Sequence, residues 1–129
     1  MRQIKLVSFF LIIIIPACRI VHVYEGKSII ISRTIDTSLN DSALIFGYVY
    51  SAIDEISPEP FAEIWIDGKD TKTTADKSGY FYLKIPAGLC TIKCKGKYSN
   101  DDEIEEIKDL TVIKNEKIEL KFFIGITIE

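Results

Sequence analysis

The strongest structural signal of this chain lies in residues 74–88, TADKSGYFYLKIPAG. Residues 80–85 alternate between two faces, and one of these faces is apolar: Phe81, Leu83 and Ile85. A period of two is typical of a β-strand with one buried side. Asp76 can cap the preceding turn with its carboxylate, and Gly79 can take the positive φ that the turn requires. Pro86 then ends the strand, so this stretch predicts one strand of fixed register.

Short alternating runs of the same kind occupy the chain on both sides of this strand. From Ala43 onward no helical period is sustained, which indicates an all-β protein. The expected strands are residues 43–51, 61–67, 72–75, 80–85, 89–95, 107–113 and 117–126. About seven strands at intervals of roughly 8 to 12 residues predict a β-sandwich of two antiparallel sheets.

Three of these runs share a more specific order of residues. They are IFGYV at residues 45–49, PFAEIWI at residues 60–66, and the stretch at residues 74–88. Together they resemble the carboxypeptidase regulatory-like domain family, whose signature joins a Gly-x-Val strand, a Pro-led strand and a Thr-x-Asp-x-x-Gly-x-Phe-x-Leu-x-Ile-Pro-x-Gly block. The resemblance extends over residues 43–124. It implies a transthyretin-like (prealbumin-like) sandwich of Greek-key topology that acts as a folding or interaction module.

The first eighteen residues have the three-part layout of an export signal. Two positive charges precede an apolar run from Leu6 to Ile15, which Pro16 ends. This run has about ten residues, whereas a membrane-spanning helix needs about 20. Residues 15–18, IPAC, resemble a lipobox, which implies cleavage before Cys18 and its acylation. Two or more acyl chains hold a protein stably to a bilayer; the alternative is a secreted protein with a free Cys18.

These observations predict three regions. Residues 1–17 are expected to be a lipoprotein signal peptide, and residues 43–126 the sandwich domain. Residues 18–42 are expected to form either a partly ordered tether or an extra hairpin around the turn Glu25-Gly26-Lys27. Arg19 follows Cys18 without an acidic run, so the resemblance to lipoprotein sorting signals implies an outer-membrane location facing the periplasm.

The charge balance excludes one class of partner. The sequence has 16 basic and 19 acidic side chains, and loss of Arg2 and Lys5 with the leader leaves a formal charge of −5. Nucleic-acid binding depends on basic stripes that displace counterions from phosphates. We therefore expect no nucleic-acid partner; the expected partners are the membrane, through acyl chains on Cys18, and an envelope protein.

No residue pattern indicates catalysis, a metal site or a cofactor. The sole histidine, His22, lies close to the proposed anchor, which is a poor place for a shaped pocket. Cys90 and Cys94 are about 13 Å apart on one straight strand, beyond disulfide reach, and are expected to be buried thiols. The acidic run at residues 101–106 is typical of a solvated face, with a calcium site as the alternative. We therefore expect no enzyme.

Outward-facing aromatic side chains are the candidate contact surface: Tyr48, Tyr50, Trp65, Tyr80 and Tyr82. Tyrosine and tryptophan give large amphipathic contacts at low entropic cost, although such rings can also cover the second face of a sandwich. The leading hypothesis is a lipid-anchored, non-catalytic interaction or structural module. The alternative is a small-ligand or glycan-binding module that uses Trp65 and the neighbouring tyrosines.

Overall fold

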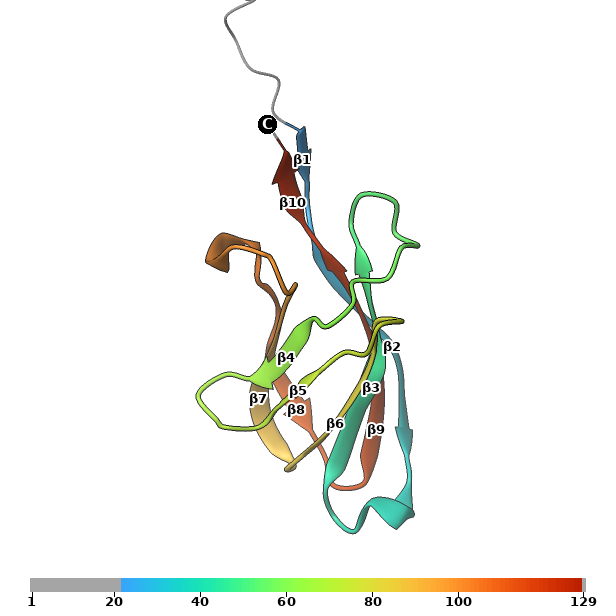
Figure 1. Cartoon of the computed structure of the whole chain (residues 1–129). Coiled ribbons are helices and arrows are strands. Elements are labelled where there is room, and N and C mark those ends of the chain that lie inside the picture. Colours follow the sequence, from blue (N-terminus) through green and yellow to red (C-terminus); the bar gives the residue numbers. More distant parts are fainter. Residues whose placement is uncertain (1–21, 129) are drawn as a thin grey trace, which may run out of the picture.

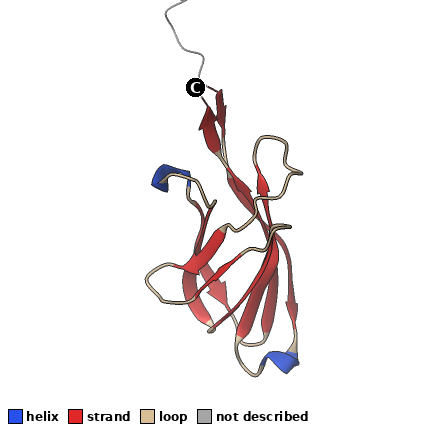
Figure 2. Ribbon diagram, in the orientation of Figure 1, coloured by secondary structure: helices blue, strands red, loops and turns tan. Residues whose placement is uncertain are grey.

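A computed structural model describes residues 22–128. Strands make up the framework, and the helical structure in this part of the chain is confined to two short 3-10 turns, Thr37–Leu39 and Asp101–Glu103 (Figure 2). The two turns lie at opposite ends of the molecule. The expected all-β class is therefore confirmed.

Two four-stranded sheets pack face to face and form the sandwich (Figure 1). The first sheet has the order β2 (Lys27–Ile35), β9 (Glu116–Ile124), β3 (Ala43–Ser51) and β6 (Tyr80–Ile85). The second has the order β5 (Lys72–Thr74), β4 (Glu63–Ile66), β7 (Gly88–Lys95) and β8 (Glu105–Val112). A separate two-stranded ribbon of β1 (His22–Tyr24) and β10 (Ile126–Ile128) rises from one end.

The connections cross repeatedly between the two sheets, so each sheet combines strands from distant parts of the chain. Pairing is antiparallel with one exception, since β3 and β9 run parallel in the middle of the first sheet. A parallel pair needs a long crossover connection. All four strands of the second sheet lie between β3 and β9 in the sequence, and the segment that contains them is this crossover connection.

Strand bounds follow the sequence expectation where the alternation is cleanest. The strands at residues 43–51 and 80–85 have the predicted bounds. The expected last strand, residues 117–126, is instead interrupted at Gly125. A side chain at Gly125 would collide with the backbone of Tyr24 and Gly26, which explains why glycine stands where the sheet passes into the ribbon.

The segment before residue 43 differs from the expected tether or hairpin. His22–Tyr24 pairs with Ile126–Ile128, while Lys27–Ile35 pairs with β9 over eight residue pairs. The chain therefore continues in one direction through Glu25-Gly26 and does not fold back. An isolated two-stranded ribbon is barely stable, whereas β2 gains a sheet that already packs on a core. Residues 27–35 thus belong to the sandwich. The predicted signal peptide, residues 1–17, and Cys18 lie outside the described residues.

The core fills the space between the sheets. Its largest fully buried side chains come from both sheets: Phe81, Phe122, Ile45, Ile64, Ile66, Ile92, Ile118 and Leu120. Cys94 is fully buried among them, and Cys90 packs partly against the cluster. Inner and outer residues alternate along β3 and β6, so burial of one face directs the aromatic residues of the other face outward.

Candidate functional site

The outer surface of the first sheet carries a continuous group of aromatic rings, which we call the tyrosine face. Its rings are Phe46, Tyr48 and Tyr50 of β3, Tyr80 and Tyr82 of β6, and Phe123 of β9. The register sets Tyr48 opposite Tyr80 and Phe46 opposite Tyr82. Four of the five predicted surface aromatics therefore share one face, as the alternation along their strands requires.

Successive rings of the tyrosine face contact one another. Tyr48 stacks on Tyr50 with centroids 5.9 Å apart, and Tyr50 stacks on Phe123 at 5.8 Å. Tyr48 meets Tyr80 edge-on at 5.3 Å, and Tyr80 and Tyr82 are 6.4 Å apart. Offset-stacked and edge-on arrangements are the favourable ones for aromatic pairs. The rings therefore hold each other in place and form a preorganised surface.

Exposure within the tyrosine face is lowest at Phe123 and highest at Tyr82, and Tyr50 and Tyr80 are half-buried. Phe123 is 5% exposed, Tyr48 is 39% exposed and Tyr82 is 64% exposed. Lys27 covers the Phe123 ring at 5.0 Å from its centroid and forms an ion pair with Glu55 at 3.0 Å. The accessible part of the face is consequently the block of tyrosines on β3 and β6.

Lysines border these rings. Lys121 lies over Tyr50 at 5.5 Å, and Lys117 lies over Phe46 at 5.6 Å. Such cation–π contacts contribute about 0.5–1 kcal/mol at exposed sites. They also hold the two ammonium groups against rings of the tyrosine face. These lysines are not among the predicted contact residues, although the alternation Lys117, Glu119, Lys121, Phe123 along one strand could have revealed them.

Trp65 does not join the tyrosines, contrary to the expected grouping. It projects from β4 on the outer surface of the second sheet, whereas the tyrosines belong to the first sheet. Because the outer surfaces of two stacked sheets face in opposite directions, no single ligand-sized site can unite them. The sequence pattern shows that a residue faces outward but does not show from which sheet.

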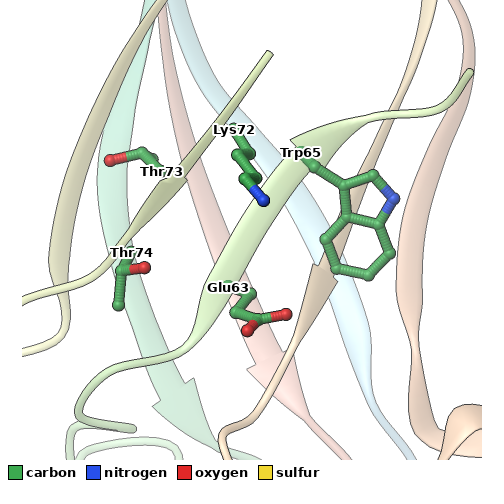
Figure 3. A pocket seen from close by; sticks show the side chains of 5 residues that line it. All are labelled: Glu63, Trp65, Lys72, Thr73 and Thr74. Carbon is green, nitrogen blue, oxygen red and sulfur yellow. The ribbon is translucent and has the colours of Figure 1, made fainter. Parts of the chain in front are cut away.

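Trp65 instead borders a shallow hollow of about 350 Å³. The hollow is lined by Glu63 and Trp65 of β4 and by Lys72, Thr73 and Thr74 of β5. In Figure 3 the indole lies on one side of β4, and Thr73 and Thr74 lie on β5 beyond the other side. The indole is half-buried, and Lys72 and Lys93 are its partners on the neighbouring strands. An aromatic ring beside hydroxyl, ammonium and carboxylate groups suits a small polar ligand.

The two described thiols are poor nucleophiles in this fold. Burial raises the pKa of the Cys94 thiol well above its usual value, and the nearby Glu105 and Glu59 raise it further. Burial also raises the pKa of the half-buried Cys90 thiol, against a smaller opposing effect of Lys69. Since the thiolate is the reactive form, both environments favour structural roles.

The remaining chemical candidates occupy separate places. His22 is exposed on β1 of the terminal ribbon. In the acidic segment, Asp101 pairs with Lys95 at 2.9 Å, and the Glu103 carboxylate accepts a hydrogen bond from the Asn100 backbone N–H. Within residues 22–128, no group of three or more histidine, cysteine, aspartate or glutamate side chains is arranged to hold a metal ion.

In the described part of the chain, no helix has the length and hydrophobicity needed to cross a membrane.

No protein-family model matches the sequence, and a comparison with curated proteins finds no match. The resemblance to carboxypeptidase regulatory-like domains therefore stays a prediction based on the motifs quoted above.

Proposed function

We propose that this chain is a lipid-anchored, non-catalytic interaction module of the cell envelope, held at the outer membrane and facing the periplasm. The observation that supports the proposal best is the tyrosine face, where Tyr48 and Tyr82 remain exposed on a rigid sheet. Large hydrophobic side chains exposed in one contiguous patch mark interaction surfaces. The resemblance of residues 43–124 to a family of interaction modules supports the same proposal.

The geometry of the tyrosine face favours a macromolecular partner. Its rings lie on a sheet surface, and the hollow at Trp65 lies on the other sheet. A small ligand gains most of its affinity from a concave site that encloses it. A protein partner can instead cover a flat surface, on which tyrosines contribute contact area with little loss of side-chain entropy.

An anchor at Cys18 is compatible with access to this face. Cys18 precedes His22, the first residue of β1, by four positions, and the terminal ribbon leaves the sandwich at one end (Figure 1). Attachment at this end would therefore leave the outer surfaces of both sheets free. The ribbon would act as a short spacer between the membrane and the sandwich.

Site-specific photo-crosslinking tests the interaction surface. A photo-reactive amino acid replaces Tyr82 in the full chain within its source cells, and the matched control replaces Thr74, which is exposed on β5 of the other sheet. We expect one discrete protein adduct from the Tyr82 position and little from the Thr74 position. Equal cross-linking at both positions would contradict a dedicated contact surface on the first sheet.

Intact-mass measurement on protein extracted from membranes tests the anchor. Wild-type chain is expected to begin at Cys18 and to carry the mass of two or three acyl chains. Cys18→Ala should release the protein from the membrane fraction, while the control Cys90→Ala should leave it there. Full-length, unacylated wild-type protein would contradict the proposed anchor.

The hollow at Trp65 favours a second candidate function, the binding of a small glycan. Trp65 is the single tryptophan of the sequence, so its fluorescence reports directly on this site. Titration with maltotriose, cellotriose and chitotriose should give a saturable change for at least one sugar, and Lys72→Ala should weaken it. Unchanged emission at millimolar concentrations of all three would eliminate this candidate.

A further inference from the structure

Charge is distributed unevenly over the molecule. The strands of the first sheet carry four lysines on their outer surface, Lys27, Lys84, Lys117 and Lys121, and one carboxylate, Glu119. Two loop carboxylates lie beside them: Glu55 pairs with Lys27 at 3.0 Å, and Asp36 lies near Lys117. Residues 18–129 nevertheless have a formal charge of −5. The tyrosine face is thus a basic surface on an acidic protein, so charge complementarity selects an acidic partner.

The arrangement of rings and charges matches the anatomy of a protein interface. The four tyrosines occupy two positions on each of two neighbouring strands, β3 and β6. Lysines of β9 lie on one side of this block, and Lys84 lies on β6. Aromatic residues at the centre and charged residues at the rim are the usual pattern of a protein–protein contact.

The size of the face is consistent with this interpretation. Four strands about 4.8 Å apart and about eight residues long at 3.3 Å per residue span roughly 19 by 26 Å, or ~500 Å² in projection. Side-chain relief increases the accessible area towards the roughly 800 Å² that each partner contributes to a standard interface. The face is therefore large enough for one globular partner.

We propose that the tyrosine face binds an acidic surface patch of a partner protein, an inference that rests on the proposed interaction function. Carboxylates of the partner would lie beside Lys117, Lys121 and Lys84, and the exposed ring of Tyr82 would pack at the centre. A second copy of this chain docked through the same face would bring lysines against lysines. Such like-charge pairs oppose self-association.

Binding of defined polymers to the full chain tests this proposal. The probes are a random glutamate–tyrosine copolymer as acidic polypeptide, polygalacturonate as acidic glycan, and neutral dextran. The test variant is Lys117→Glu/Lys121→Glu. The matched control is Lys95→Glu/Lys108→Glu, which makes the same change in charge on the outer surface of the second sheet, away from the hollow at Trp65.

We expect the copolymer to bind the wild-type chain and the control variant, with an association rate that falls as salt is raised. The Lys117→Glu/Lys121→Glu variant should associate roughly tenfold more slowly. Three results would overturn the proposal: no copolymer binding, equal loss in both variants, or binding of polygalacturonate in preference to the copolymer. Circular dichroism establishes that the variants keep their strand content.

The cross-linking experiment separates failure of this inference from failure of the proposed function. The same two variants are combined with the photo-reactive amino acid at Tyr82. An adduct that persists unchanged in Lys117→Glu/Lys121→Glu would overturn the acidic-partner inference and leave the interaction surface in place. Absence of any adduct from the wild-type chain would contradict both.

Discussion

At the scale of single residues, Gly47 shows how tightly the first sheet is assembled. It lies in the middle of β3 with φ 152°, and a side chain there would collide with the Leu120 carbonyl oxygen on β9. The parallel pair at the centre of the sheet therefore depends on a residue without a Cβ. This provides a physical reason for the glycine of the Gly-x-Val run.

We predict that Gly47→Ala destabilises the protein by about 3 kcal/mol, since both backbone strain and displacement of β9 contribute. Gly68→Ala is the control, because Gly68 also has positive φ but has open space around it. The control should lose only about 1 kcal/mol. Urea unfolding measures both, and equal losses would show that the contact with Leu120 is unimportant.

The pair of Arg33 and Glu116 is a second residue-scale feature, one that links the two sheets. Arg33 donates from Nε and Nη2 to the Glu116 carboxylate at 2.7 and 2.9 Å, and from Nη2 to the Thr111 carbonyl of β8 at 2.6 Å. Glu116 is 6% exposed. The hydrogen bonds from Arg33 are the main cause that lowers the pKa of the Glu116 carboxyl, against a smaller opposing effect of burial.

We predict that Arg33→Met costs about 2 kcal/mol at neutral pH, because it leaves a buried carboxylate without its cation. A lowered pKa contributes stability that is complete above the unfolded value and is lost as pH falls through the folded value. The difference between wild type and Arg33→Met should therefore shrink below about pH 4. Denaturant unfolding across pH measures it, and a pH-independent difference would contradict the pairing. Arg33→Met/Glu116→Leu should recover most of the loss.

At the scale of elements, β2 forms one edge of the first sheet. Its residues 29–31 are three isoleucines that are 38–45% exposed, and a register shift between Ile30 and Ser32 interrupts its pairing with β9. An apolar edge strand is an aggregation hazard, which bulges and charged residues reduce. The bulge and the anchored Arg33 thus protect an edge that a flat isoleucine strand would leave open.

Hydrogen exchange should distinguish β2 from the ribbon. Three residue pairs hold β1 to β10, whereas eight hold β2 to β9 beside the core. Amides of residues 27–35 that donate within the sheet are predicted to exchange at least about tenfold more slowly than those of residues 22–24. Mass spectrometry of peptides from the full chain measures both segments. Equally fast exchange would mean that residues 27–35 act as a tether after all.

At the scale of the whole molecule, one core joins both sheets, so the sandwich should unfold as a unit. The two described cysteines lie at different depths, so their reactivity can test whether the sandwich unfolds as a unit. Cys94 is 0% exposed within the core cluster, and Cys90 is only partly covered. Reagents can therefore reach Cys90 in the folded protein, while Cys94 requires the sheets to separate.

We predict that iodoacetamide modifies Cys90 slowly in native protein and Cys94 only through unfolding. Urea should accelerate labelling of Cys94 in proportion to the unfolded population, while it has a weaker effect on Cys90. Peptide mass spectrometry separates the two sites. Equal rates in the absence of urea would show that the second sheet opens locally around β7.

Local patterns predicted much of this architecture because they depend on neighbouring residues alone. The strands at residues 43–51 and 80–85 have the expected bounds, since strict alternation defines a strand and its two faces. The outward orientation of Tyr48, Tyr50, Tyr80 and Tyr82 was predicted for the same reason. Local patterns predict residues 117–126 as one strand and residues 18–42 as a tether or hairpin. The structure differs from this at Gly125 and at residues 27–35, because strand pairing over long sequence distances determines their conformation.

The all-β class, most strands and the set of outward aromatic side chains follow from the sequence pattern alone, since a period of two is local information. Which strands are neighbours depends instead on how the whole chain packs. This packing places β9 between β2 and β3, which brings Lys117 and Lys121 onto the tyrosine face, and it assigns Trp65 to the opposite surface. Alternation allows any outward residue to belong to either sheet, and only the packing of the whole chain selects one.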